Sequence, residues 1–245
     1  MHVGTEYEHI FTLPTRIEDA ALPQPLKPRK APRQARARAT CEAIVEAAAR
    51  IVAERGLAGF NTNAVATRAG VSIGSLYQYF PNKDALMVAL IERQQETQSR
   101  TITQAAAQLG AANLADSVHA LVRAAARHHR DAPLFASAID HEEARLPLTA
   151  LIDGYARRNG ALVAQVLDRF SHELGPLDSQ RAARTIPAIV RTVVDAWANL
   201  DPPDLAAAES EATRAVLGYL RAGAGDLRVV SRSIDAPGAT AALSA

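Results

Sequence analysis

The sequence is poor in cysteine and in long apolar runs, and both absences restrict what the protein can be. One cysteine in 245 residues excludes an internal disulfide framework and is compatible with a reducing cytoplasm. We expect Cys41 to be a small residue on a helix face. The longest uncharged run, Thr101 to Ala115, is broken by glutamines, an asparagine and a glycine, so we expect no membrane-spanning helix. No basic segment followed by an apolar stretch opens the chain, and we therefore expect a cytoplasmic protein without a secretory signal.

Aromatic residues and net charge are also scarce. Aromatic residues make up 4% of the chain, whereas hydrophobic residues, many of them alanine, make up 48%. This composition favours an all-α protein whose helices pack closely through small side chains. The formal net charge is only +1, so any affinity for nucleic acid must come from a local patch. The chain contains no glycine-rich phosphate loop, HExxH or paired-cysteine motif, and we expect neither an enzyme nor a cofactor.

The most informative stretch runs from Asn61 to Lys83, with the sequence NTNAVATRAGVSIGSLYQYFPNK. It predicts a helix capped by Asn61 or Thr62 and ended by Gly70, because glycine adopts the left-handed conformation without strain. Ser72 then caps a second helix, which ends before Pro81 because proline disfavours helical geometry at the preceding residue. Two short helices joined by a glycine-containing turn are typical of a DNA-binding helix-turn-helix. The alternative is a helical hairpin in which Tyr77 and Phe80 serve only the core.

The second of these helices has a polar outer face, and small residues near its start would let it approach base edges closely. The segment from Glu42 to Leu90, and above all the run AGVSIGSLYQYFPNKDAL, resembles the N-terminal domain of TetR-family (tetracycline-repressor-like) transcriptional regulators. The resemblance implies that Ser72 to Tyr79 form the recognition helix. It implies phosphate contacts from Thr62, Tyr77, Tyr79 and Lys83, and base-facing positions at Asn63, Ile73, Gly74, Ser75 and Gln78. Ala64 departs from the family pattern, in which this position is often polar or basic.

The remaining sequence predicts further helices and two irregular ends. Residues 1–33 contain five prolines and no sustained apolar period, so we expect a disordered arm. Six basic residues occur without an acidic residue among them or between them and Glu42, namely Lys27, Arg29, Lys30, Arg33, Arg36 and Arg38. This run is either a phosphate-binding arm or a solvated tail. We expect a DNA-binding domain at residues 34–84, a helical effector-binding and dimerisation domain at 85–222, and a flexible tail at 223–245. A long helix starting at Asn82 should link the two domains.

The resemblance implies two tasks for the second domain: its last two helices would form a dimer interface, and its middle helices would enclose a small-molecule pocket. For the pocket we expect Val118, Leu121, Tyr155, Ile186 and Val190. For the interface we expect Val194, Trp197, Leu217 and Leu220, although ordinary core packing is the competing interpretation. Pro187 interrupts a helical stretch and would free a carbonyl near Ala183. Such a kink lies beside a cavity or serves packing alone.

A group of possible metal ligands, His128, His129, Asp140 and His141, was tested against the geometry of a helix. Adjacent helical residues point about 100° apart, so we expect that His128 and His129 do not share an ion, and we predict no metal site. The sequence thus favours a homodimeric, ligand-responsive repressor that binds a palindromic double-stranded DNA operator and is released by a hydrophobic or aromatic small molecule. The alternative is a helical metal-binding protein or metalloenzyme built on the four metal-ligand candidates.

Overall fold

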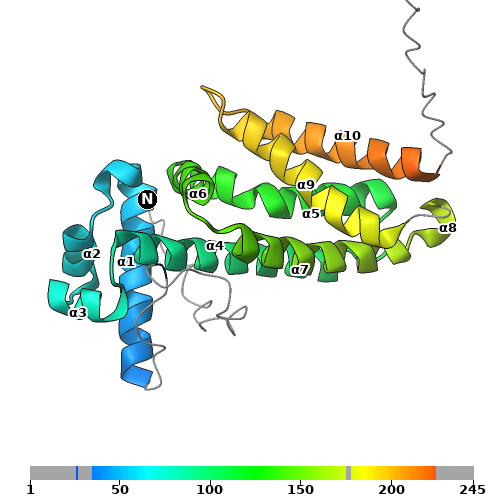
Figure 1. The fold of residues 1–245 in the computed structure, drawn as a ribbon. Coiled ribbons are helices and arrows are strands. Elements are labelled where there is room, and N and C mark those ends of the chain that lie inside the picture. Colours follow the sequence, from blue (N-terminus) through cyan, green and yellow to red (C-terminus); the bar gives the residue numbers. More distant parts are fainter. Residues whose placement is uncertain (1–25, 27–34, 175–177, 225–245) are drawn as a thin grey trace, which may run out of the picture.

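The computed structural model describes Leu26, residues 35–174 and residues 178–224. Within these residues every regular element is a helix, so the predicted all-α class is confirmed. Figure 1 shows three helices at one end of the molecule, joined by the long helix α4 to a bundle that extends away from them. The predicted arm and tail fall almost entirely outside the described residues. Leu26 of the arm is described and is buried against the core of the first three helices. The first two residues of the predicted tail continue the last helix, which ends at Ala224.

The first three helices are α1 (Ala35–Gly59), α2 (Thr62–Ala69) and α3 (Ile73–Tyr79). The regular part of α1 ends near Gly56, which has φ 59° and ψ −162°, a conformation that glycine adopts without steric cost. Apolar side chains of α1, led by Ile44, Ile51 and Val52, form the centre of this unit. The periodicity of these residues, which repeats along one helix face, predicts this burial.

The caps of α2 and α3 follow the sequence prediction. Asn61 Oδ1 accepts a hydrogen bond from the Ala64 amide at 2.9 Å, and Gly70 ends α2 in the left-handed conformation with φ 68° and ψ 29°. Ser72 Oγ accepts from the Ser75 amide at 3.0 Å. Phe80, the residue before proline, is extended with φ −118° and ψ 110°. Local hydrogen bonding and backbone sterics therefore set the length and the separation of the two motif helices.

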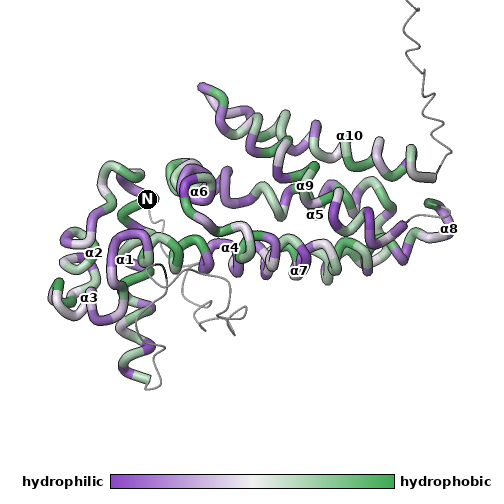
Figure 2. The backbone as a smooth tube through the Cα atoms, viewed as in Figure 1, coloured by the Kyte–Doolittle hydropathy of each residue, from purple (hydrophilic) through white to green (hydrophobic). Residues whose placement is uncertain are grey.

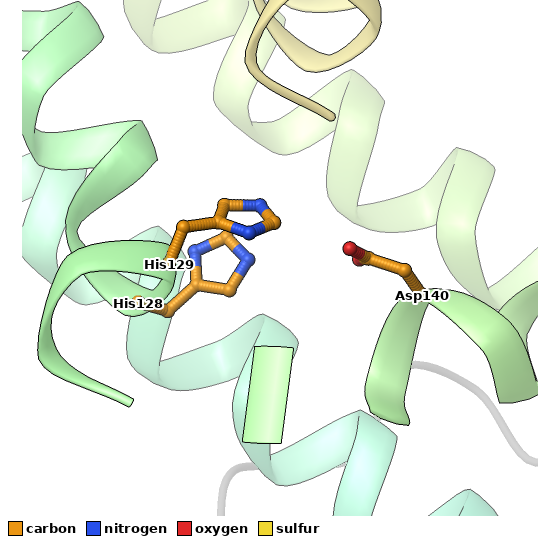
Figure 3. Close-up of side chains that lie close together, drawn as sticks. All are labelled: His128, His129 and Asp140. Carbon is orange, nitrogen blue, oxygen red and sulfur yellow. The ribbon is translucent and has the colours of Figure 1, made fainter. Parts of the chain in front are cut away.

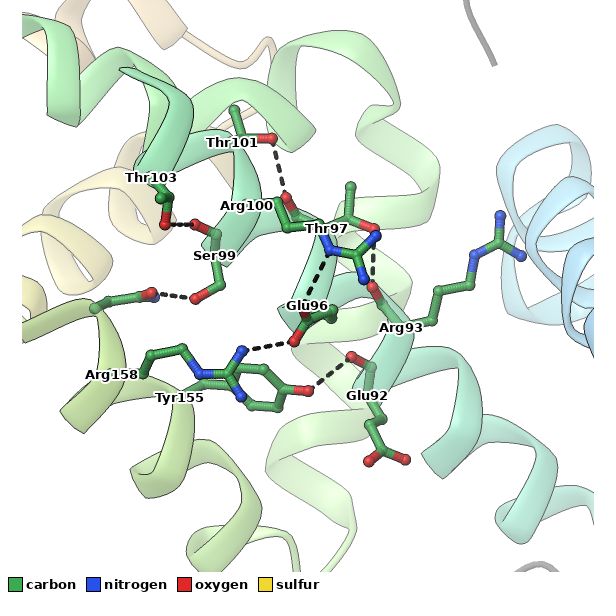
Figure 4. Close-up of polar contacts among 11 residues, drawn as sticks. Glu92, Arg93, Glu96, Thr97, Ser99, Arg100, Thr101, Thr103, Tyr155 and Arg158 are labelled. Carbon is green, nitrogen blue, oxygen red and sulfur yellow. Dashed lines mark hydrogen bonds and ion pairs between the residues drawn. The ribbon is translucent and has the colours of Figure 1, made fainter. Parts of the chain in front are cut away.

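Helix α4 (Lys83–Ala107) has 25 residues and is about 38 Å long at 1.5 Å per residue. Asn82 caps it, with Oδ1 accepting from the Ala85 amide at 2.7 Å, as predicted. Its second half is rich in polar residues, yet none of residues 91–100 is fully exposed. Figure 4 shows part of the reason, since Glu92, Glu96 and Ser99 form a polar seam with α7. In that seam Arg158 Nη1 donates to Glu96 Oε2 at 2.7 Å, and Tyr155 OH donates to the Glu92 carbonyl at 3.4 Å.

The remaining helices form the bundle and pack on α4. They are α5 (Leu114–Asp131), α6 (Pro133–Arg145), α7 (Thr149–Asp168), α8 (Ser171–Leu174), α9 (Ser179–Ala198) and α10 (Leu205–Ala224). Helices α5 and α9 lie between α10 on one side and α4 and α7 on the other (Figure 1). Apolar and polar residues alternate along these helices (Figure 2). No helix among the described residues is both long enough and apolar enough to cross a membrane.

Two apolar cores hold the molecule together, and the first is not confined to the predicted DNA-binding domain. It runs from α1, α2 and α3 through the start of α4 to Ile139 on α6 and Leu151 and Tyr155 on α7. The second core joins α5, α7, α8, α9 and α10 around Val122, Ile186 and related residues. Because α6 packs directly on α1, the unit that carries the motif helices is attached to the bundle by more than the connecting helix.

Candidate DNA-binding surface and internal cavity

Helix α3 is anchored on one side and open on the other. Leu76 is fully buried and fixes the helix to the core. Ile73 and Tyr77, which are each 39% exposed, lie on the outer side, together with exposed Gly74 and Gln78. Two large apolar side chains left in solvent on so short a helix indicate a surface that serves an outside partner.

Gly74 has no packing role inside the chain. A Cβ added at this position would meet only Ser72 Oγ, at 3.8 Å. The backbone of Gly74 is also ordinary helix, so neither conformation nor space requires glycine here. The missing side chain instead leaves the first turn of α3 open to close approach from outside.

The residues expected to contact phosphates frame α3 on both sides. The Thr62 hydroxyl at the start of α2 lies 3.1 Å from the Tyr77 hydroxyl, and this contact ties the two motif helices together. Tyr79 is half-buried against the core. Lys83, the first residue of α4, is exposed, and its Nζ lies 5.2 Å from the centre of the Phe60 ring. Among the base-facing residues, Asn63 is exposed on α2 and Ser75 is half-buried on α3.

An ion pair that the sequence did not reveal holds α2 in place. Arg68 donates through both terminal nitrogens to Glu54 on α1, each at 2.5 Å. The hydrogen bonds from Arg68 lower the pKa of Glu54 and keep it ionised. A paired guanidinium of this kind orients a helix through its fork geometry, so Arg68 positions α2 and is not free for DNA. Sequence spacing gives no signal for a pair 14 positions apart.

The bundle contains a partly open cavity of about 580 Å³. Val118, Leu121, Ile186 and Val190, four of the five residues expected in a pocket, line it. The fifth, Tyr155, does not, because its ring is buried in the first core and its hydroxyl points to α4. Pro187, which lies within α9, also lines the cavity. The wall contains glutamines of α4 that sequence periodicity did not single out, namely Gln94, Gln95 and Gln98.

The residues expected at a dimer interface divide into two pairs. Val194 and Leu220 are buried in the second core of the same chain. Trp197 and Leu217 are half-buried, and Leu200, just after α9, is 48% exposed. Helical periodicity identifies an apolar face, but it does not distinguish the face turned to the core from one turned to another chain.

One end of the cavity is polar. His128 and His129, in the last turn of α5, and Asp140 on α6 have potential ligand atoms that all lie within 4.8 Å of one another. Figure 3 shows both imidazoles facing the carboxylate across a gap, and the two ring centres are 4.0 Å apart. Adjacent histidines were not expected to face one ion easily, yet both rings turn toward the same carboxylate although their Cβ directions diverge. His141 is exposed and does not belong to this group.

Burial and neighbouring charges govern the ionisation of this polar end. Burial lowers the pKa of His128 to about 4, with a contribution from His129. His128 is therefore neutral at pH 7. Burial, together with the negative charges of Asp195 and Glu143, raises the pKa of Asp140 to about 6.

Helix α6 links the polar end of the cavity to the start of α4. Asp140 and Glu143 on α6 face the cavity. On the same helix, Arg145 donates to Asp84 Oδ1 on α4 at 2.5 Å and lies 2.6 Å from Glu142 Oε2. Asp84 follows Lys83 in the first turn of α4. Helix α6 thus contacts both the cavity and the first turn of α4, next to the motif helices.

Two family profiles match the chain and cover both parts of this architecture. The profile described as bacterial regulatory proteins, tetR family, matches residues 44–90. The profile described as tetracyclin repressor-like, C-terminal domain, matches residues 113–220. The chain belongs to the TetR family of transcriptional regulators. Its helix-turn-helix unit is the DNA-binding part of such a regulator.

Solved structures with the same fold include other TetR-family regulators. One is a TetR-family transcriptional regulator from Streptomyces coelicolor, 25% identical, with a TM-score of 0.59 over 75% of this chain and 97% of that chain. Another is the fatty acid degradation regulator FadR from Bacillus halodurans, 23% identical, with a TM-score of 0.55 over 74% and 96% of the two chains. A third is SmeT in complex with triclosan, 23% identical, with a TM-score of 0.51 over 74% and 91%. No curated protein matches this chain in sequence.

Proposed function

We propose that this TetR-family regulator is a repressor that binds a palindromic operator as a homodimer and releases it when a small hydrophobic molecule enters the cavity. The observation that carries the proposal is the position of α6. This helix forms part of the cavity wall and is paired through Arg145 with Asp84, at the start of α4. The proposal assigns the protein no reaction and places it in the cytoplasm, where its operator would be.

The exposed face of α3 supports readout in the major groove. Gln78 and Asn63 can form hydrogen bonds with base edges, and the open surface at Gly74 would let the helix approach them. Thr62, Tyr77, Tyr79 and Lys83 surround this face and suit contacts with phosphates, which position a protein without reading sequence. Exposed Arg36 and Arg38 in the first turn of α1 add positive charge beside the same unit.

The dimer proposal depends on the last two helices. Half-buried Trp197 and Leu217 and exposed Leu200 lie on or next to α9 and α10, where a second copy could cover them. A two-fold dimer would present two recognition helices to half-sites about 34 Å apart, one turn of DNA. Val194 and Leu220 would support this surface from within the core.

The effector proposal depends on the chemistry of the cavity wall. Apolar side chains from α5, α7 and α9 supply much of the wall, and His128, His129 and Asp140 form a polar group on it. This arrangement suits a small molecule with an apolar body. The SmeT structure with the same fold is a complex with triclosan, an aromatic compound, which supports the same class of ligand here. To release DNA, the effector must bind the DNA-incompetent state more tightly, since equal affinity for both states shifts nothing.

The test is a fluorescence anisotropy titration of a labelled duplex taken from the regulator's own upstream intergenic DNA, with a scrambled duplex as control. We expect saturation at two chains per duplex, preference for the native sequence, and an affinity that falls steeply with salt. A panel of hydrophobic compounds is then screened for release of the bound duplex. Equal, weak binding to both duplexes at every salt concentration would contradict an operator at this position, and saturation at one chain per duplex would contradict the dimer.

A further inference from the structure

The polar end of the cavity gathers three side chains of a type that binds metal ions. His128, His129 and Asp140 come from α5 and α6, and their potential ligand atoms lie within 4.8 Å of one another. Two imidazoles and a carboxylate form a mixed nitrogen and oxygen donor set. Such donors suit zinc and the neighbouring divalent first-row transition metals better than magnesium or calcium, which prefer oxygen ligands alone.

We propose that His128, His129 and Asp140 bind one divalent first-row transition metal ion, of the zinc type, at this end of the cavity. This site is an addition to the DNA-binding regulator and does not replace that function, as the sequence-based alternative of a metalloenzyme would. It also does not depend on the proposed repression, because the ion can bind whether or not an operator is recognised. Its failure and that of the proposed function are therefore distinguishable.

The hydrogen bonds of the two histidines leave a lone pair available on each ring. Nδ1 of His128 lies 3.2 Å from the carbonyl oxygen of Ala125. A carbonyl only accepts, so Nδ1 carries the proton and Nε2 keeps its lone pair. Nε2 of His129 faces Asp195 Oδ1 at 3.4 Å, which in the same way favours the proton on Nε2 and a lone pair on Nδ1. Metal-binding histidines commonly have this kind of orienting partner, a carbonyl or a carboxylate, on the other ring nitrogen.

The charge around the site also favours a cation. Asp140 Oδ2 is buried and has no hydrogen-bond partner within the described structure. The charged groups that act on Asp140 include two further carboxylates, Asp195 and Glu143, and one guanidinium, Arg191. Arg191 is already shared between these two carboxylates. Three carboxylates and one guanidinium give a formal local charge of −2 when all are ionised, which a divalent ion would balance.

The distances require only a small adjustment. With zinc–nitrogen bonds of about 2.0–2.1 Å, ligand atoms in a tetrahedral site lie roughly 3.4 Å apart. Closing from a separation of up to 4.8 Å needs a shift of about 1 Å or less at each side chain, which small torsion changes supply. Three protein ligands leave at least one coordination position, and in this place it faces the cavity.

The experiment uses full-length, tag-free protein that has been dialysed against a chelator and then against metal-free buffer. Cobalt(II) is titrated in and followed by its visible d–d absorption, and zinc(II) binding is measured by isothermal titration calorimetry. We expect one equivalent per chain, with zinc displacing cobalt from the site. Asp140→Asn and His128→Gln preserve side-chain size and should weaken zinc binding by at least about 100-fold.

His141→Ala is the matched control, since His141 follows Asp140 directly but is exposed and outside the group. This variant should bind zinc and cobalt like the wild type. Circular dichroism of each metal-free variant verifies that the helices are intact. The proposal is overturned if the wild-type protein shows neither cobalt absorption nor zinc binding. It is also overturned if folded Asp140→Asn and His128→Gln bind zinc as tightly as His141→Ala.

Discussion

Gly160 on α7 packs against the backbone of Ala183 on α9, at a distance that leaves no room for a side chain. A methyl group at position 160 would lie 2.1 Å from the Ala183 carbonyl oxygen and 2.9 Å from its carbon. Pro187, four residues later, has no N–H to donate to that carbonyl. The close approach of α7 and the proline within α9 therefore occur at the same place, beside the cavity that Pro187 lines.

Gly160→Ala should destabilise the protein by about 1–3 kcal/mol, because the obstacle is backbone and α7 and α9 must move apart. Thermal unfolding followed by circular dichroism measures this loss. Gly74→Ala serves as the matched control, since the same methyl group there makes only an ordinary contact with Ser72 Oγ, at 3.8 Å, and alanine favours a helix. If the two variants unfold at the same temperature, α7 and α9 are not in this close contact.

Gly74→Ala has its own expected outcome on DNA. It should leave the unfolding temperature unchanged or slightly raised, while weakening operator binding, because a methyl group on the outer turn of α3 would stand between the helix and the bases. Anisotropy titration against the native duplex measures the affinity. Unchanged operator affinity in this variant would mean that α3 does not approach the bases at Gly74.

The division between phosphate and base contacts is tested by two pairs of substitutions. Tyr79→Ala and Lys83→Ala should weaken binding to all sequences alike. Lys83→Ala should also lower the slope of log binding constant against log salt concentration by about one. Gln78→Ala and Asn63→Ala should instead relax the preference at particular base pairs, at a cost of about 1–3 kcal/mol for the preferred base. Binding to a set of duplexes with single base-pair changes separates the two patterns. If each of the four substitutions lowers the affinity for every duplex by the same factor, the division into phosphate and base contacts is wrong.

Arg145→Gln should uncouple the cavity from the DNA-binding unit. It removes the guanidinium that joins α6 to Asp84. The pair with exposed Asp84 alone contributes within about 1 kcal/mol, but the buried carboxylate of Glu142 also loses its guanidinium partner. The expected loss of stability is therefore about 1–3 kcal/mol. We expect a ligand to bind the cavity with unchanged affinity but to release the operator less completely. Arg214→Gln, whose ion pair with Glu211 lies within α10, should release DNA like the wild type. Equal release from both variants would exclude the Arg145 pair as the link.

Glu46 gives the attachment of α1 to α4 a pH dependence. It pairs with Arg93 on α4 at 2.5 Å and with Arg50 at 2.7 Å. Burial alone would raise its pKa, but the bonds to the two arginines outweigh burial and lower it from the ordinary value of 4.5. The contribution to stability is therefore present in full above the unfolded pKa and is lost as the pH falls through the folded pKa.

Glu46→Gln should lower the free energy of unfolding by about 1 kcal/mol at pH 7, since the arginines are partly exposed. It should also flatten the decline of the unfolding temperature that the wild type shows as the pH falls below about 5. Thermal unfolding at a series of pH values measures both effects. Parallel pH profiles for the two proteins would show that Glu46 does not titrate in this way.

Local chemistry explains which parts of the fold were predictable. Asn61, Gly70, Ser72 and Asn82 define helix ends through hydrogen bonds or backbone preferences that involve only near neighbours in sequence. These ends, and the match to a known motif between them, could be read directly. The burial of the polar half of α4 could not be predicted, because its partners on α7 lie about 60 residues away in sequence.

The candidate sites show the same limit. Four of the five residues expected in the pocket line the cavity, but the fifth, Tyr155, lies in the first core. Apolar residues at helical spacing look the same in sequence whether they face a cavity or a packed core. The convergence of His128 and His129 on Asp140 was missed, because a rule based on Cβ directions ignores how far side chains turn at the end of a helix. The pair of Arg68 with Glu54 has no local signature.

The sequence by itself determined the all-α class, the capped helix-turn-helix and the family, because these depend on residues close together along the chain. Only the tertiary structure decided that α6 touches both the cavity and α4, that Gly160 meets the α9 backbone, and that two histidines and an aspartate share one end of the cavity. Each of these depends on how helices distant in sequence pack against one another. That packing is set by the summed burial of many apolar side chains, which no single stretch of sequence specifies.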